Sequence, residues 1–189
     1  KHVKKYKTLL RHFDIKEVQK NFHSGTKWSL AFPYKLNDKI VNYKYRTLDK
    51  DFRQEANSRR SLFNVDAIKN KKEIIFVEGE MDVLALYECG ITNVVSLPDG
   101  APKEAKFRDD DKRFDALKES AELLAKAEKV IIAVDMDTAG QALTQELAHR
   151  FGKDRCYLVD WNMDNKDAND ALVFQNKDYV VEQIKRAKP

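Results

Sequence analysis

The sequence has 189 residues, which is enough for one ordinary domain or for two small ones that share a core. Apolar residues make up 42% and charged residues 35%, with a formal net charge of +4, as is typical of a folded protein with a heavily charged surface. No apolar run is long enough to cross a bilayer, so we expect no membrane partner. The two cysteines, Cys89 and Cys156, have neither the spacing of a zinc site nor that of a disulfide framework, which favours a reducing compartment.

Basic residues are concentrated at positions 1–72, whereas acidic residues gather at particular points from Glu78 onward. A basic half beside an acid-bearing half suits a protein that holds a polyanion and metal ions together. An ordinary solvated surface has the same signature, and charge alone favours that plainer interpretation.

The N-terminal part is predicted to contain a short helix followed by a β-hairpin. A helix is expected over residues 14–22, because Asp14 can act as its N-cap and Glu17 occupies the capping-box position. Residues 28–48 hold two runs rich in β-branched and aromatic residues. The pair Asn37-Asp38 between these runs predicts the turn of the hairpin.

From residue 73 onward the pattern alternates between strand and helix. The predicted strands are continuous apolar runs, and they lie at residues 73–79, 93–97, 129–135 and 155–160. The predicted helices lie at residues 80–90, 115–128, 138–152 and 179–187. This order indicates an α/β fold with a mostly parallel sheet that helices cover on both faces. The long charged loop at residues 98–113 is expected to be mobile or to order around a ligand.

Two carboxylates lie at the end of the predicted strand at residues 129–135. Residues i and i+2 of a strand point the same way, so Asp135 and Asp137 should leave the strand end on one side, where open parallel sheets bind ligands. A helix cap would explain Asp137 and would leave Asp135 without a partner. A divalent cation explains both acids, because two nearby carboxylates repel each other until a metal neutralises them.

The first predicted strand of this half ends in the same manner. Glu78 belongs to the strand end and should face the same crevice, and Gly79 lets the chain turn without a side chain in the cleft. Glu80 is explained by the dipole of the helix that it begins. A third acidic cluster, NKDANDAL, has Asp167 after the fourth strand, and taken alone it is an ordinary capped helix start.

These motifs resemble a known family. VEGEMDVLAL, VVSLPDGAP, IIAVDMDTAGQAL and KDANDAL, in this order, resemble the Toprim fold, the metal-binding catalytic domain of bacterial-type primases, topoisomerases and some nucleases. In detail they are similar to the primase half of the phage and organellar primase-helicases, the Twinkle-like family. The preceding SLAFPYKL, YKYR and SRRSLFN resemble the small N-terminal part of that polymerase fold. The resemblance implies a basic α+β subdomain at residues 1–72 and a Toprim domain at residues 73–189.

The resemblance also implies a role for each acid. Glu78 matches the Toprim glutamate, which is thought to act in acid–base chemistry or in metal binding. Asp135 and Asp137 match the metal-binding pair, and Asp82 matches the accessory acid of the first helix. Asp167 matches the late acid of the KDAN motif, which helps to hold a further metal or its waters. The implied cofactor is Mg²⁺ or Mn²⁺.

Cations of the basic region are the implied nucleotide and DNA contacts. Lys44 and Arg46 lie where primases keep positive charge against nucleotide phosphates or template, and Arg53, Arg59 and Arg60 are further candidates for the same role. A solvated hairpin face explains these cations equally well.

The implied activity is that of a DNA primase, a nucleotidyltransferase that makes short RNA primers on single-stranded DNA from ribonucleoside triphosphates. Tyr43 and Tyr45 are candidates for stacking on a base, although core packing is an equally simple role. Two alternatives stay open: a Toprim nuclease that uses the same acids to cut, and a non-catalytic single-stranded-DNA-binding module of a replicative helicase.

Two parts of the family's proteins are not found in this sequence. The zinc-binding module that selects the start sequence is missing, and no GxxxxGK[ST] helicase motif occurs. With Lys1 at the start in place of Met, we expect either the catalytic fragment of a primase-helicase or a relative that lost these parts. The expected partner is the helicase domain or subunit of a replisome. The compartment stays open between bacterial or phage-infected cytoplasm and an organelle matrix.

Overall fold

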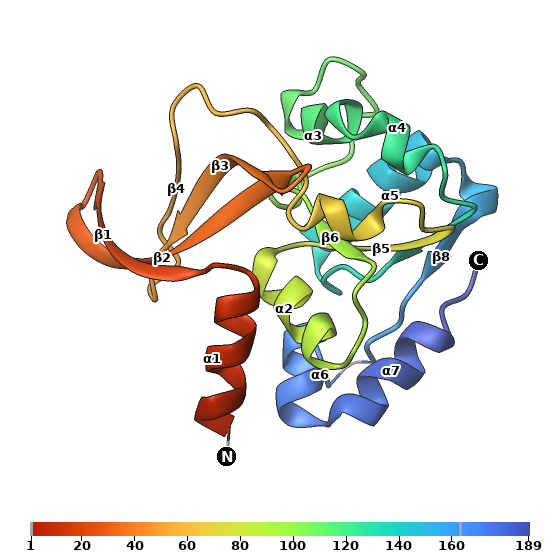
Figure 1. The fold of residues 1–189 in the computed structure, drawn as a ribbon. Coiled ribbons are helices and arrows are strands. Elements are labelled where there is room, and N and C mark those ends of the chain that lie inside the picture. Colours follow the sequence, from red (N-terminus) through yellow and green to blue (C-terminus); the bar gives the residue numbers. More distant parts are fainter. Residues whose placement is uncertain (1, 163) are drawn as a thin grey trace.

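The computed structural model describes residues 2–162 and 164–189 (Figure 1). Two four-stranded sheets organise this part of the chain, an antiparallel sheet of order β1-β2-β3-β4 and a parallel sheet of order β6-β5-β7-β8. The Toprim-like half is therefore an α/β unit with a parallel sheet, as predicted.

The antiparallel sheet follows an N-terminal helix. The elements of this half are α1 (His2–His12), β1 (Lys16–Phe22), β2 (Gly25–Leu36), β3 (Lys39–Arg46) and β4 (Phe52–Gln54). The strands of the parallel sheet are β5 (Glu73–Val77), β6 (Val94–Ser96), β7 (Lys129–Ile132) and β8 (Cys156–Leu158).

Helices cover both faces of the parallel sheet (Figure 1). They are α2 (Glu80–Glu88), α3 (Asp115–Glu119), α4 (Ala121–Leu124), α5 (Thr138–Phe151), α6 (Ala168–Phe174) and α7 (Lys177–Lys185), with short 3₁₀ turns η1 (Val65–Ile68), η2 (Lys112–Phe114) and η3 (Lys153–Arg155). Alternate residues of β5 enter different cores, as the period of a strand requires. Ile75 packs with α2, α6 and α7, whereas Ile74 packs with α3, α4 and α5.

The helix predicted over residues 14–22 is wrong. Residues 16–22 form β1, which pairs with β2 from Lys16 opposite Ala31 to Phe22 opposite Gly25. Asp14 has a left-handed φ of 53° just after α1, and its carboxylate accepts a hydrogen bond from Lys35 instead of capping a helix. The capping-box pattern was therefore overridden by pairing with a neighbouring strand.

The predicted hairpin is confirmed. Asn37 and Asp38 connect β2 to β3 with φ values of 52° and 60°. Two successive positive φ angles are the geometry of a type I′ turn, which matches the twist of the flanking strands. The carboxylate of Asp66 accepts hydrogen bonds from both turn amides, at 2.8 and 2.9 Å, and so ties the hairpin to η1.

The two halves share one hydrophobic core. Leu9, Phe32 and Tyr34 pack in the same cluster as Val77 of β5 and Leu86 of α2. This cluster is continuous between the antiparallel sheet and the Toprim-like half, and the boundary at residue 72 stays a prediction. No described helix has the length and apolar character needed to span a membrane.

Candidate active site

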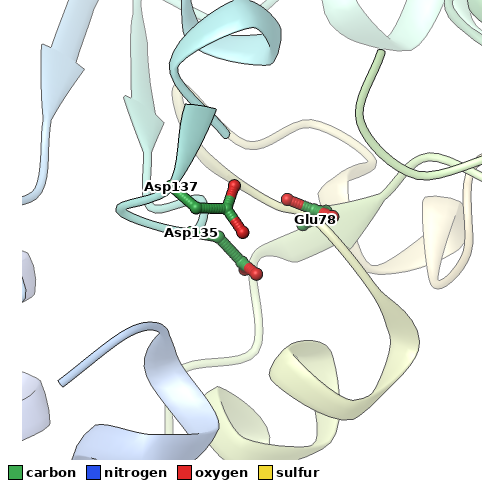
Figure 2. A group of neighbouring side chains, drawn as sticks. All are labelled: Glu78, Asp135 and Asp137. Carbon is green, nitrogen blue, oxygen red and sulfur yellow. The ribbon is translucent and has the colours of Figure 1, made fainter. Parts of the chain in front are cut away.

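Three carboxylates converge at the carboxyl edge of the parallel sheet (Figure 2). Glu78 follows β5, and Asp135 and Asp137 follow β7, the strand that pairs directly with β5. One carboxylate oxygen from each residue lies within 4.8 Å of the others. Adjacent parallel strands end at the same edge, which is why residues 57 positions apart in sequence meet here.

The two aspartates are positioned by a loop, and not by the strand alternation that was predicted. β7 ends at Ile132, so Asp135 and Asp137 lie in the loop before α5, and strand alternation does not set their directions. Asp137 is the N-cap of α5, and its Oδ1 accepts hydrogen bonds from the amides of Ala139 and Gly140, both at 3.0 Å. The Gly140 amide and the Lys166 ammonium lower the pKa of Asp137, although partial burial acts against them. Because the cap uses only Oδ1, the second oxygen is left to face the other acids.

Glu78 has a strongly shifted pKa. Burial, followed by the charges of Asp135 and Asp137, raises the pKa of its carboxyl to about 7. Its Oε2 is buried and has no hydrogen-bond partner among the described residues. Oxygen-only donors, like charges at close range and an unsatisfied buried carboxylate oxygen together fit a site for a hard divalent cation.

Lys166, which was not predicted as a site residue, contacts both Asp135 and Asp137. The ammonium of Lys166 lies 2.8 Å from Oδ2 of Asp135 and 3.0 Å from Oδ2 of Asp137. These carboxylates raise the pKa of Lys166, so it stays protonated at neutral pH. Lys166 is the first residue of the KDAND motif, where its position beside Asp167 was the available signal.

Asp82 and Asp167 are two further acids at the same cleft. Asp82 lies in the first turn of α2, is 8% exposed, and accepts a hydrogen bond from the amide of Asn169 at 3.3 Å. Asp167 caps α6 through a hydrogen bond of 2.8 Å from the amide of Asp170. Burial is the main cause that raises the pKa of both carboxyls. The charge of Asp167 raises the pKa of Asp82 further, and the charge of Asp135 raises the pKa of both. Both acids line the same cleft.

This cleft has a volume of about 720 Å³ and lies between the two sheets. Acids of the parallel sheet line one wall, and the antiparallel sheet contributes Lys44, Arg46 and Arg53 to the lining. A cleft lined by both basic and acidic residues is suited to a ligand that carries phosphates together with metal ions. Three of the five predicted cations thus line the cleft, although the guanidinium of Arg53 donates a hydrogen bond to the carbonyl oxygen of Asn21 in β1.

Lys44 is held in the cleft by a buried ion pair. Its ammonium lies 2.8 Å from Oε1 of Glu80, and the two side chains are only 10% and 3% exposed. The hydroxyl of Tyr34 donates a hydrogen bond to the same carboxylate oxygen. Glu80 therefore joins β2 and β3 to α2, a role that goes beyond the helix dipole and that local sequence did not indicate.

The other two predicted cations point elsewhere. Arg59 pairs with Glu119 at 2.6 Å on the surface, and Arg60 pairs with Asp99; neither arginine lines the cleft. Tyr45 is buried and packs with Tyr43, which supports the structural role for these tyrosines.

Three residues in and beside β4 line the cleft and were not predicted. Phe52 is 51% exposed and lines the cleft together with Lys50 and Gln54. The side-chain amide of Gln54 donates to Oδ1 of Asp99 at 2.9 Å and so links β4 to the loop after β6. A three-residue strand between charged turns leaves almost no periodic signal, which explains the omission.

The sequence is similar to that of known Toprim and primase-related proteins. The Toprim domain family matches residues 72–157. The chain is 42% identical over 170 residues to the Primase homolog protein of Arabidopsis thaliana, covering 85% of this chain and 50% of that protein. It is 40% identical over 175 residues to the Twinkle homolog protein, chloroplastic/mitochondrial, of the same plant, covering 87% of this chain and 25% of that protein.

A similarity to solved structures extends over both halves. The primase fragment of the bacteriophage T7 primase-helicase protein superposes with a TM-score of 0.74 at 23% identity, over 94% of this chain and 69% of that one. At this level of identity the match shows the shared fold. The chain spans half or less of the two plant relatives, so what those whole proteins do is a matter for proposal.

Proposed function

We propose that this chain, a Toprim-type primase domain of the phage and organellar primase-helicase (Twinkle-like) family, catalyses metal-dependent, template-directed synthesis of short RNA primers on single-stranded DNA. One observation carries the proposal. Three carboxylate oxygens, from Glu78, Asp135 and Asp137, lie within 4.8 Å of one another at the end of the sheet. Glu78 and Asp135 line a cleft to which the antiparallel sheet contributes basic residues.

In this proposal Glu78, Asp135 and Asp137 hold Mg²⁺ or Mn²⁺, and Asp82 and Asp167 hold a further ion or its waters. When bound, such an ion lowers the pKa of an attacking 3′-hydroxyl and offsets negative charge on a leaving pyrophosphate. The ligands are all carboxylate oxygens, the type that Mg²⁺ prefers.

The basic wall binds the polyanionic substrates. Lys44, Arg46 and Arg53 offset the charge of a ribonucleoside triphosphate and of the template backbone. Phe52, half-exposed in the same cleft, offers an aromatic face on which a base stacks. Because the chain corresponds to about a quarter of the Twinkle homolog, the helicase part of such a protein is the proposed partner.

A direct test uses labelled ribonucleotides and a single-stranded DNA template, with oligonucleotide product as the readout, in Mg²⁺ and in Mn²⁺. Asp135→Asn and Asp137→Asn each remove one negative charge from the site, and we expect product to fall by about 10²-fold or more. Asn is as good an N-cap as Asp, so Asp137→Asn keeps the start of α5. Asp178→Asn, an exposed acid of α7 outside the cleft, is the matched control and should keep full activity.

Three results would contradict the proposal. Undiminished synthesis by the Asp135 and Asp137 variants would remove these acids from the chemistry. Metal-dependent cleavage of DNA without nucleotides would assign the same acids to a nuclease. Binding of single-stranded DNA without product in either metal would leave a non-catalytic binding module.

A further inference from the structure

Lys166 occupies a position between two of the proposed metal ligands. Its ammonium contacts Oδ2 of Asp135 at 2.8 Å and Oδ2 of Asp137 at 3.0 Å, the second of which is the oxygen of Asp137 that the helix cap leaves available. The Asp135 side chain is only 10% exposed, so its charge is poorly screened by solvent without a nearby cation. Lys166 supplies that cation from within the chain.

Hydrogen bonds fix the backbone at Lys166, whereas its side chain is free to move. The carbonyl of Lys166 accepts a hydrogen bond of 2.9 Å from the amide of Met136, which lies between the two acids. The next residue, Asp167, caps α6 and fixes the other side of Lys166. The side chain itself is 51% exposed, so the ammonium can leave the acids without any change in the fold.

Simultaneous occupancy by Lys166 and a metal ion is unfavourable. A divalent ion lies about 2.1 Å from a carboxylate oxygen. An ion on Oδ2 of Asp135 would therefore lie no more than about 4.9 Å from the ammonium, given the 2.8 Å contact of Lys166. Cations at that separation repel strongly in a partly buried site.

We propose that Lys166 is a built-in counter-ion, which holds Asp135 and Asp137 together in the metal-free chain and which a divalent ion must displace. The inference rests on the proposed function only in taking Glu78, Asp135 and Asp137 as the metal site. Its consequence is that the chain alone binds divalent ions more weakly than its three carboxylates would otherwise allow. The displaced ammonium remains in the cleft, of which Lys166 is a lining residue.

The test compares Mn²⁺ affinity, measured from the electron paramagnetic resonance signal of free Mn²⁺, in the 189-residue chain and its variants. Lys166→Met keeps the apolar stem and removes the charge, and we expect it to bind Mn²⁺ about tenfold more tightly, a typical coupling between competing sites. Lys166→Arg retains the charge and should bind as weakly as the wild type. Lys50→Met removes a different cleft cation, one not within 4.0 Å of either acid among the described residues, and should leave the affinity unchanged.

Thermal unfolding gives a second readout that does not depend on activity. Without metal, Lys166→Met should unfold at a lower temperature than the wild type, because the acids lose their counter-ion. Saturating Mg²⁺ should raise its unfolding temperature by more than that of the wild type. Equal or weaker Mn²⁺ binding by Lys166→Met would overturn the inference while leaving the metal site intact. No binding by either protein would overturn both the inference and the proposed metal site.

Discussion

Gly140 offers a sharp test of how the loop after β7 is positioned. It lies in the first turn of α5, where its amide donates to Asp137, and it is packed directly against the backbone of Asp135. A Cβ added at residue 140 would lie 1.9 Å from the carbonyl oxygen of Asp135 and 2.7 Å from its carbonyl carbon. Contacts of a Cβ shorter than 3.0 Å essentially never occur, so Gly140→Ala must move this backbone by at least 1.1 Å.

The magnitude follows from two opposing effects. Ala is favoured over Gly in a helix by about 1 kcal/mol. Overpacking costs about 1–3 kcal/mol, and the upper end applies because the obstacle is backbone rather than a flexible side chain. We therefore expect Gly140→Ala to lower the free energy of unfolding by about 2 kcal/mol. A backbone displacement of at least 1.1 Å at Asp135, a proposed metal ligand, should also reduce primer synthesis by about 10²-fold.

Urea denaturation, followed by far-UV circular dichroism, measures the first effect, and the primer assay measures the second. Gly79→Ala is the matched control at the other side of the site. Gly79 has an extended φ of −136°, and an added Cβ would meet only Oδ2 of Asp82, at an ordinary 3.8 Å. Its loss of stability should stay below about 1 kcal/mol. A Gly140→Ala variant as stable as the wild type would refute the argument from close approach.

Two further predictions concern buried charge. Burial and the charges of Asp135 and Asp137 raise the pKa of Glu78 from its ordinary 4.5 to about 7 in the folded, metal-free chain. The protonated carboxyl of Glu78 therefore contributes stability below pH 4.5, and this contribution is lost as the pH rises to about 7. The measurement is made in EDTA to keep the site free of metal. Glu78→Gln should remove this loss, and an unchanged slope of unfolding free energy against pH would contradict the assignment. Lys44→Met leaves the Glu80 carboxylate buried without its cation and should lower the free energy of unfolding by about 3 kcal/mol. Adding Glu80→Gln to Lys44→Met should restore part of that loss, and strict additivity in the denaturation cycle would show that the two residues do not interact.

The parallel sheet and its acids could be predicted because their signals are local. Continuous apolar runs identify buried strands, and Asp-x-Asp or Glu-Gly at a strand end places acids at the ligand-binding edge. Gly90, with a φ of 85°, ends α2 where the sequence predicted the end of that helix. These signals can be read from the sequence without knowing which residues lie nearby in space.

The sequence-based predictions fail where contacts between residues far apart in the sequence determine the local structure. Residues 16–22 carry a capping-box pattern, yet only Phe22 of β1 is buried, so no alternation of apolar residues indicates the strand that pairing with β2 creates. The predicted helix at residues 115–128 is interrupted at Ser120, between α3 and α4. The partnership of Glu80 with Lys44 joins residues 36 positions apart, and no local pattern predicts such a pair.

The core that α1, β2, β5 and α2 have in common has a consequence for how a substrate is received. The cationic wall and the carboxylate wall belong to halves that are fused through Phe32, Tyr34 and Val77, so the width of the gap between them is set at folding. Under the proposed function, a nucleotide that binds here would not have to bring two lobes together, so its binding energy could serve to orient the reacting atoms. For the same reason, neither half could be exchanged for that of a distant homologue without rebuilding the seam that joins them.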